Sequence, residues 1–185
     1  MSSSKTTTTM TIKDSQVPSD VAPATKFTRR ARSYRKPALL LLGAGLVAGL
    51  DLAVKDAAET FLASGTVVDL GALTLKLHYN TGVAFSLGAN LPAWAVAGGT
   101  GAVIAALLCY LLAVASTMNL LSSAGAGMLL GGAAGNFIDR LDGRGVVDYL
   151  HTGWFPTFNL ADAFVTLGLA ALILGTLQRR VPRRR

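Results

Sequence analysis

Long apolar segments separated by short polar ones dominate the chain from residue 38 onward. The apolar segments cover residues 38–54, 91–115, 120–138 and 160–178. The second and third lie in a stretch, residues 77–138, that contains no Asp, Glu, Lys or Arg. A helix needs about 20 predominantly apolar residues to span a bilayer. We therefore predict an all-α membrane protein built as a four-transmembrane-helix bundle.

The polar segments between these helices predict a small β element beside the bundle. Residues 66–77 favour strands with a turn at Gly71, and residues 146–150 form a largely apolar run of strand length. Within the third predicted helix, small residues recur at every fourth position, which lets another helix approach closely. These residues are Gly127, Gly131 and Gly135.

Composition and charge indicate a membrane protein with both ends on one side. Hydrophobic residues make up 51% of the chain and charged residues 15%, fewer charges than an ordinary soluble domain carries. Most of the 17 Lys and Arg residues lie in residues 1–36 or after Leu177. Basic residues beside apolar spans mark the cytoplasmic side, so we expect cytoplasmic termini and an extracytoplasmic β element. Nucleic-acid binding would also use such cations, but no stacking aromatics are interleaved with them, and we predict no nucleic-acid partner.

The chain divides into one membrane domain and two tails. Residues 1–36 are rich in Ser, Thr and Pro and have no sustained apolar period, so we expect a disordered basic cytoplasmic tail. Residues 37–180 form the four-span domain, and residues 181–185 form a second basic cytoplasmic tail. A basic region before an apolar run is also typical of a signal peptide, but a retained first helix puts both basic ends on one side. The single cysteine, Cys109, excludes an intrachain disulfide, and we expect it to be a packing residue.

Five polar clusters lie at the ends of the predicted helices, all on the outer face of this topology. A charge at the centre of a bilayer costs about 2.5–3.5 kcal/mol, so polar groups at span ends are informative. The clusters are residues 51–55 (DLAVK), 80–85 (NTGVAF), 135–140 (GNFIDR), 146–150 (VVDYL) and 158–162 (FNLAD).

Carboxylates are the most numerous reactive groups in these clusters. A zinc peptidase motif such as HExxH is absent, since neither His78 nor His151 has a Glu beside it, and we predict no metal and no cofactor. Two aspartates that share one proton can activate a water molecule for attack on an amide without a metal. The sequence also leaves open a Ser–Lys dyad, formed by Ser64 or Ser86 with Lys55 or Lys76.

Asp148 and Asp162 are the best candidates for such a pair. Asp148 interrupts an apolar run, and Asp162 lies among apolar residues at the start of the last predicted helix. Packing explains neither position. A proton-coupled transporter or channel component would use intramembrane carboxylates as well, and a purely structural membrane protein would tolerate their replacement.

The other polar residues have structural interpretations. Asp51 and Lys55, four residues apart, predict a helix ion pair. Asp139, beside Arg140, is expected to be an ion-paired scaffold residue, whereas Asn136 and Arg140 could also contact a ligand. Asn159, three residues before Asp162, fits a helix cap and a substrate contact equally well. The aromatic residues expected at the membrane interface are Tyr149, Trp154 and Phe155.

The motifs DLAVK, NTGVAF, GNFIDR, VVDY and FNLAD, in this order over residues 37–180, closely resemble those of lipoprotein signal peptidase, also called signal peptidase II. The resemblance implies a four-helix aspartyl endopeptidase of the bacterial inner membrane. Such an enzyme removes the signal peptide from prolipoproteins just before a diacylglyceryl-modified cysteine, so lipid-modified prolipoproteins and membrane lipid are the implied partners.

The resemblance also implies a role for each motif residue. The catalytic dyad would be Asp148 and Asp162, without a cofactor. The implied substrate contacts are Asn80, Asn136, Arg140 and Asn159. The implied supporting residues are Asp51, Lys55 and Asp139. The oligomeric state does not follow from the motifs.

Overall fold

The computed structural model of the chain describes residues 35–82 and 91–180, with side chains described as far as residue 178. The expected tails lie almost entirely outside the described residues, as do Ser86 and the end of the NTGVAF motif.

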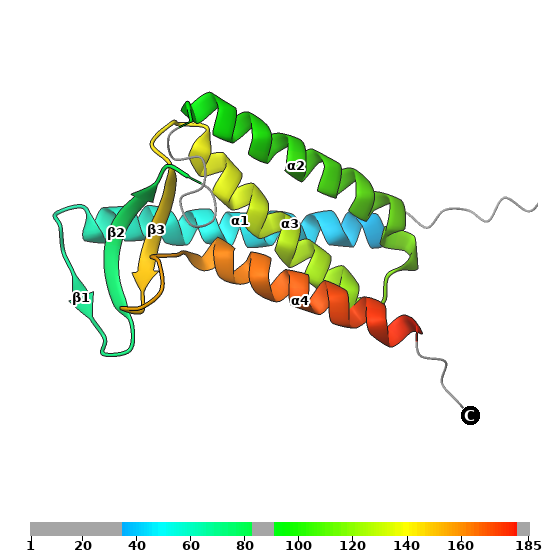
Figure 1. The fold of residues 1–185 in the computed structure, drawn as a ribbon. Helices are drawn as coiled ribbons and strands as arrows, with labels where there is room; N and C mark the ends of the chain where they lie inside the picture. The colour runs from blue at the N-terminus through cyan, green and yellow to red at the C-terminus, as the bar shows by residue number, and fades with distance from the viewer. Residues whose placement is uncertain (1–34, 83–90, 181–185) are drawn as a thin grey trace, which may run out of the picture. The chain divides into compact units, whose positions relative to one another are not determined.

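Four long helices form the body of the structure (Figure 1). They are α1 (Arg35–Leu62), α2 (Ala93–Val114), which continues into the short 3-10 helix η2 (Ala115–Thr117), α3 (Leu120–Arg140) and α4 (Leu160–Arg180). Helices α1, α3 and α4 each contain one of the predicted apolar segments, and α2 with η2 covers the predicted segment 91–115 except its first two residues. Helix α1 continues well past the predicted end of its apolar segment at residue 54, because Asp51 and Lys55 find polar partners inside the protein.

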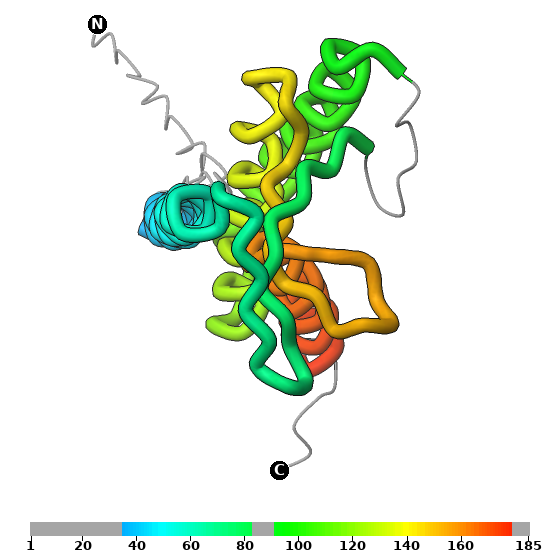
Figure 2. Tube along the Cα trace, turned by 90° about the vertical axis from the view of Figure 1, so that its left-hand side faces the viewer, coloured from blue at the N-terminus to red at the C-terminus, as the bar shows by residue number. Residues whose placement is uncertain are grey.

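Helix α3 is the central helix and packs against the other three. Figure 2 looks at the structure from the end that carries the sheet and shows α2 and α4 apart from each other, with α3 between them. The predicted close approach at Gly127, Gly131 and Gly135 is confirmed, because all three face α1. A Cβ atom built on Gly131 would lie 2.5 Å from the carbonyl oxygen of Ala44.

A second set of glycines lies between α3 and α4 and was not predicted. Cβ atoms built on these residues would lie 2.5–2.6 Å from backbone atoms of the opposite helix. The set comprises Gly125, Gly132, Gly168 and Gly175. Because the backbones are so close, the first turn of α4 lies directly against the last turns of α3.

Three of the four predicted spans are long and apolar enough to cross a membrane: α1, α2 with η2, and α4. Helix α3 is not among them, because Gly, Ser and Asn residues lower its hydropathy. The outer surface of the bundle is apolar: Leu46 is 68% exposed, Val103 68% and Leu167 59%. Lipid would cover such a surface favourably, whereas water would not.

A small antiparallel sheet lies at one end of the bundle, as predicted (Figure 1). Its strands are β1 (Val68–Asp69), β2 (Thr74–Asn80) and β3 (Val146–His151), in the order β1-β2-β3. The turn between β1 and β2 contains Gly71 with a φ of +85°, a conformation that favours glycine. Pairing of Asn80 with Val146 joins two predicted clusters that are far apart in the sequence.

The structure corrects two predictions about single side chains. Cys109 is exposed on α2 and is not a packing residue. Tyr149 is buried, with its hydroxyl oxygen 3.3 Å from the donating N–H of Leu160, so it is not an interfacial aromatic residue. Trp154, by contrast, is 84% exposed.

Substitution of Gly168 by alanine should lower the melting temperature of the protein. The new Cβ would lie 2.5 Å from the backbone nitrogen of Leu129, and such overpacking costs about 1–3 kcal/mol. The control is Gly98→Ala on α2, where the Cβ has open space and the helix propensity of alanine should stabilise by up to about 1 kcal/mol. Thermal unfolding of both variants in one detergent tests this. A Gly168→Ala protein as stable as the wild type would show that the α3–α4 contact is looser than described.

Candidate active site

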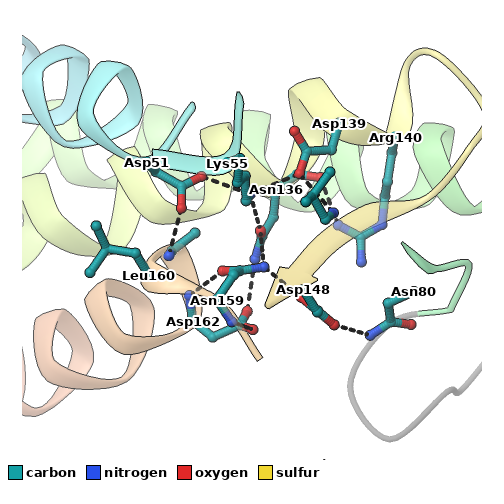
Figure 3. Close-up of polar contacts among 12 residues, drawn as sticks. Asp51, Lys55, Asn80, Asn136, Asp139, Arg140, Asp148, Asn159, Leu160 and Asp162 are labelled. Atoms are coloured by element: carbon teal, nitrogen blue, oxygen red, sulfur yellow. Dashed lines mark hydrogen bonds and ion pairs between the residues drawn. The ribbon is translucent and has the colours of Figure 1, made fainter. Parts of the chain in front are cut away.

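The described parts of the five polar clusters meet where the sheet joins the bundle (Figure 3). Helix α1 contributes from its second half, α3 from its last turns and α4 from its first turn. Strands β2 and β3 contribute from their paired ends. The predicted site residues are therefore brought together from five elements.

Asp148 lies on β3 with its carboxylate turned into the protein, where the residue is 1% exposed. Its Oδ1 accepts a hydrogen bond from Asn159 Nδ2 at 2.7 Å, and its Oδ2 accepts one from Asn80 Nδ2 at 3.2 Å. Burial raises the pKa of Asp148 to about 6, and the nearby charge of Asp162 acts in the same direction. The two amide hydrogen bonds and the charge of Lys55 oppose this rise.

Asp162 lies in the first turn of α4 and is partly exposed. Its Oδ1 accepts a hydrogen bond from Asn136 Nδ2 at 2.8 Å, and its Oδ2 accepts one from the backbone N–H of Asn159 at 3.2 Å. The backbone N–H of Asp162 in turn donates to Asn159 Oδ1 at 3.0 Å. These reciprocal bonds are a capping box that begins α4.

Asn159 is consequently a helix cap, one of the two roles that the sequence left open. It is completely buried, and its Nδ2 donates both to Asp148 and, at 3.1 Å, to Asn136 Oδ1. Both carboxylates of the predicted dyad thus bond to this one residue. The cap fixes where α4 begins and also where the two aspartates lie.

Behind the two aspartates, Lys55 is buried on α1 with three polar partners. Its Nζ lies 2.7 Å from Asp51 Oδ2, which confirms the predicted ion pair. It also lies 2.8 Å from Asp139 Oδ2 and 2.8 Å from Asn136 Oδ1. Asp139 is ion-paired as predicted, but its partner is Lys55 and not its sequence neighbour Arg140.

Asp51 and Asp139 also bind backbone groups. The N–H of Ala161 donates to Asp51 Oδ1 at 2.8 Å, and the N–H of Val147 donates to Asp139 Oδ2 at 3.2 Å. Both donors lie next to a residue of the predicted dyad in the sequence. The two supporting carboxylates therefore attach α1 to α4 and α3 to β3.

Arg140 projects from the end of α3 between the bundle and the segment after β2. Its Nη1 donates to the carbonyl oxygen of Asn136 at 2.8 Å and its Nη2 to that of Gly82 at 2.9 Å. Its Nε is buried and has no hydrogen-bond partner within the described ranges. Arg140 therefore retains donor capacity at the site.

A cavity of about 640 Å³ opens beside the two aspartates. Of the predicted site residues, its walls include Asn80, Asn136, Arg140, Asp148 and Asp162. The other wall residues are mainly apolar: Val146, Phe155, Pro156, Thr157, Phe158, Ala163, Val165, Thr166 and Leu167. Asn159 and the supporting residues do not line this cavity and lie behind its polar wall. Two carboxylates at an apolar cavity can transfer protons to and from a bound peptide group.

The Ser–Lys alternative does not form in the described part of the chain. The Ser64 hydroxyl bonds to Thr66 Oγ1 at 2.7 Å, and the three polar contacts of Lys55 are with Asp51, Asp139 and Asn136. Neither Lys55 nor Ser64 lines the cavity.

The apolar wall of the cavity was not predicted from the sequence. Val165 and Thr166 follow Asp162 at the i+3 and i+4 positions of α4, so they share its helical face. This spacing could have identified them. Phe158 stacks edge-on against Phe155 with ring centroids 5.9 Å apart, a contact between loop residues that periodicity does not reveal.

Comparisons with known proteins identify a matching family, similar proteins and a similar solved structure. A family model described as signal peptidase (SPase) II matches residues 43–178. The chain is 38% identical over 146 residues to the lipoprotein signal peptidase of Sinorhizobium fredii, covering 76% of this chain and 86% of that protein. It is 37% identical over 163 residues to that of Mycobacterium leprae, covering 83% and 79%. A bacterial membrane enzyme solved by the in meso method at 2.3 Å resolution has a TM-score of 0.67 at 26% identity, with 80% of this chain and 93% of that chain covered.

The carboxyl group of Asp148 should lose its proton with a midpoint near pH 6, since burial disfavours its charged form. Asn80→Ala should move this midpoint upward, because Asn80 donates a hydrogen bond that stabilises the ionised carboxylate. The measurement is infrared difference spectroscopy of the protonated carboxyl band during a pH titration, with Asp148→Asn identifying the band. A midpoint that falls on removal of Asn80 would contradict the described hydrogen bond.

Proposed function

The chain belongs to the signal peptidase II family, and from this membership we propose that Asp148 and Asp162 are its catalytic dyad. Members of this family are aspartic peptidases that cleave the signal peptide from lipoprotein precursors in bacterial membranes, and this is the function of the chain. The observation that carries the proposal is that both carboxylates lie at one apolar cavity and bond to the same residue, Asn159. Family membership does not favour the transporter or channel alternative.

The dyad would act by general acid–base catalysis with one proton on the pair. We assign the proton to Asp148, the more buried carboxyl group, so that Asp162 is the base. Asp162 would take a proton from a water molecule as its oxygen attacks the carbonyl carbon of the peptide bond. Asp148 would donate its proton toward the leaving amine as the C–N bond breaks. When the products leave, the proton taken by Asp162 passes to Asp148, and the starting state is restored.

Three polar residues of the cavity wall would contact the peptide: Asn80, Asn136 and Arg140. All three residues line the cavity, and the Nε of Arg140 has no hydrogen-bond partner among the described residues. Asn159 was predicted as a further substrate contact, but its complete burial supports a different role. We propose that it positions the dyad and does not contact the substrate.

We propose four membrane spans with cytoplasmic termini and an extracytoplasmic site. Helix α3 would be the fourth span, covered largely by its neighbours and therefore in less need of apolar surface. The start of α1 and the end of α4 lie at the end of the bundle away from the sheet (Figure 1). The basic residues near both ends support their cytoplasmic location.

The diacylglyceryl group of the substrate would supply much of the binding energy. Each buried CH₂ group contributes about 0.8 kcal/mol of membrane affinity, which keeps the substrate in the bilayer. The mainly apolar cavity wall, including Val165 and Leu167 of α4, is suited to a substrate that arrives laterally from the lipid.

Asp148→Asn and Asp162→Asn should each lower kcat by about 10²–10⁴-fold, because each removes a proton-transferring group with little change of shape. The double variant should be scarcely slower than either single variant, since the two groups act as a unit. The assay follows the shortened product of a lipidated prolipoprotein in detergent. Asp69→Asn, at an exposed carboxylate on β1, is the matched control and should leave turnover unchanged. Full turnover in one dyad variant would mean that the replaced aspartate is not catalytic.

Removal of the diacylglyceryl group from the substrate cysteine should lower both kcat and kcat/KM by at least about tenfold. Binding energy from a remote group can be used to orient the reacting bond, so its loss affects turnover as well as affinity. The comparison uses one prolipoprotein with and without the lipid at the same detergent concentration. Equal rates would leave a membrane aspartic peptidase without specificity for lipid-modified precursors.

A further inference from the structure

We propose that Lys55 is a positioning residue that fixes the orientation of the Asn136 side-chain amide, and through it the donors that hold both carboxylates of the dyad. This inference rests on the proposed roles of Asp148 and Asp162. It assigns to a buried cation a task other than charge neutralisation.

Lys55 cannot act on the substrate directly. Its side chain is 2% exposed and does not line the cavity. An ammonium group has three N–H donors and no acceptor, and Lys55 Nζ has three oxygen partners within 2.8 Å. One of its N–H groups donates to Asn136 Oδ1, and its other two contacts are ion pairs with Asp51 and Asp139.

The side-chain amide of Asn136 can occupy its site in only one orientation. Its Oδ1 accepts from Lys55 Nζ at 2.8 Å and from Asn159 Nδ2 at 3.1 Å, while its Nδ2 donates to Asp162 Oδ1 at 2.8 Å. A flipped amide would turn its NH₂ group toward two donors and its oxygen toward a carboxylate, so three hydrogen bonds would become three repulsive contacts. Lys55, which can only donate, and the carboxylate of Asp162, which can only accept, both favour this orientation of the amide.

The fixed amide orients the donors of both aspartates. Asn136 Nδ2 faces Asp162, and Asn136 Oδ1 holds Asn159 Nδ2, which also donates to Asp148 at 2.7 Å (Figure 3). Two hydrogen-bonded branches thus run from Lys55, one to each carboxylate. Without Lys55, the Asn136 amide loses one of the three contacts that hold it in place, and its hydrogen bond to Asp162 is less firmly oriented.

Neutralisation alone does not explain this lysine. Asp51 and Asp139 give it two carboxylate partners, so the three residues together carry a charge of −1. Removal of Lys55 alone would leave two buried carboxylates unpaired, and a loss of folding would then hide any effect on the dyad. The informative variant therefore removes one positive and one negative charge together.

That variant is Asp139→Asn/Lys55→Met, and its control is Asp139→Asn, which retains the ammonium. One oxygen of Asp139, Oδ2, meets both Lys55 Nζ and the N–H of Val147, so the asparagine oxygen can keep both contacts and the attachment of α3 to β3. Relative to the control, the double variant should lose about 10- to 100-fold in kcat, a usual effect of removing a supporting residue. KM for a lipidated prolipoprotein should stay within about threefold, because no group that lines the cavity has changed.

The pH profile is a readout that a simple loss of folded protein would not move. Loss of the Lys55 charge raises the pKa of Asp148, since that charge lowers it in the wild type, so the alkaline limb of kcat should move to higher pH in the double variant. The other charged or titratable groups around Asp148 are Asp162 on α4, Arg140 on α3, and the exposed His78 opposite it on β2. These are unchanged in both variants, and Asp139 on α3 carries the same substitution in both.

Gly168→Ala is a second control, because it weakens helix packing without touching the polar network. It should reduce the folded fraction and leave the pH profile in place. A double variant with the kcat and the pH profile of Asp139→Asn would overturn the positioning role, as would a loss of kcat without a shift of the alkaline limb. Failure of the dyad itself would show differently, as turnover retained by Asp148→Asn or Asp162→Asn.

Discussion

The hydrogen bond from the N–H of Ala161 to Asp51 Oδ1 joins the first helix to the last, and much of the site geometry depends on it. It is possible only because glycines bring the helix backbones close together. A Cβ atom on Gly132 would lie 2.6 Å from the carbonyl oxygen of Ala161, and one on Gly135 would collide with Asp51. Small residues on α3 thus allow α1 and α4 to reach each other across it. The start of α4, and with it the position of Asp162, follows from this close packing.

The polar groups at this end of the bundle satisfy one another in surroundings that would otherwise penalise them. Burial of an unpaired charge costs several kcal/mol, whereas here each buried carboxylate accepts hydrogen bonds or binds Lys55. Asp148 differs from the others in degree. Its hydrogen bonds and the charge of Lys55 offset only part of the effect of burial, which raises its pKa to about 6. A carboxyl group that readily holds a proton is what a general acid requires. The site therefore combines well-paired supporting residues with one carboxyl group, that of Asp148, which keeps its proton to a higher pH than usual.

The sequence predicted much of this arrangement because the strongest signals are local. Apolar runs located the helices, and the spacing of Asp51 and Lys55 predicted an ion pair that the structure confirms. Asp148 and Asp162 were identifiable because each interrupts an apolar environment. The partner of Asp139 and the burial of Tyr149 were not predictable, since both depend on how separate elements pack. The close contacts of the glycines between α3 and α4 were not predictable for the same reason, because they depend on the position of the opposite helix.

The double use of Asn159 and Asp162, as helix cap and as part of the site, has a consequence for drug resistance. Asp162 lines the cavity, so a small molecule that binds its carboxylate would bind a group on which the start of α4 also depends. Replacing Asp162 to exclude the molecule would disturb the fold together with the chemistry. Escape by mutation would be confined to the apolar wall, at positions such as Val165 and Leu167, where side chains can change size without breaking a hydrogen bond. An inhibitor that binds mainly to the polar wall of the cavity would therefore leave few viable routes to resistance.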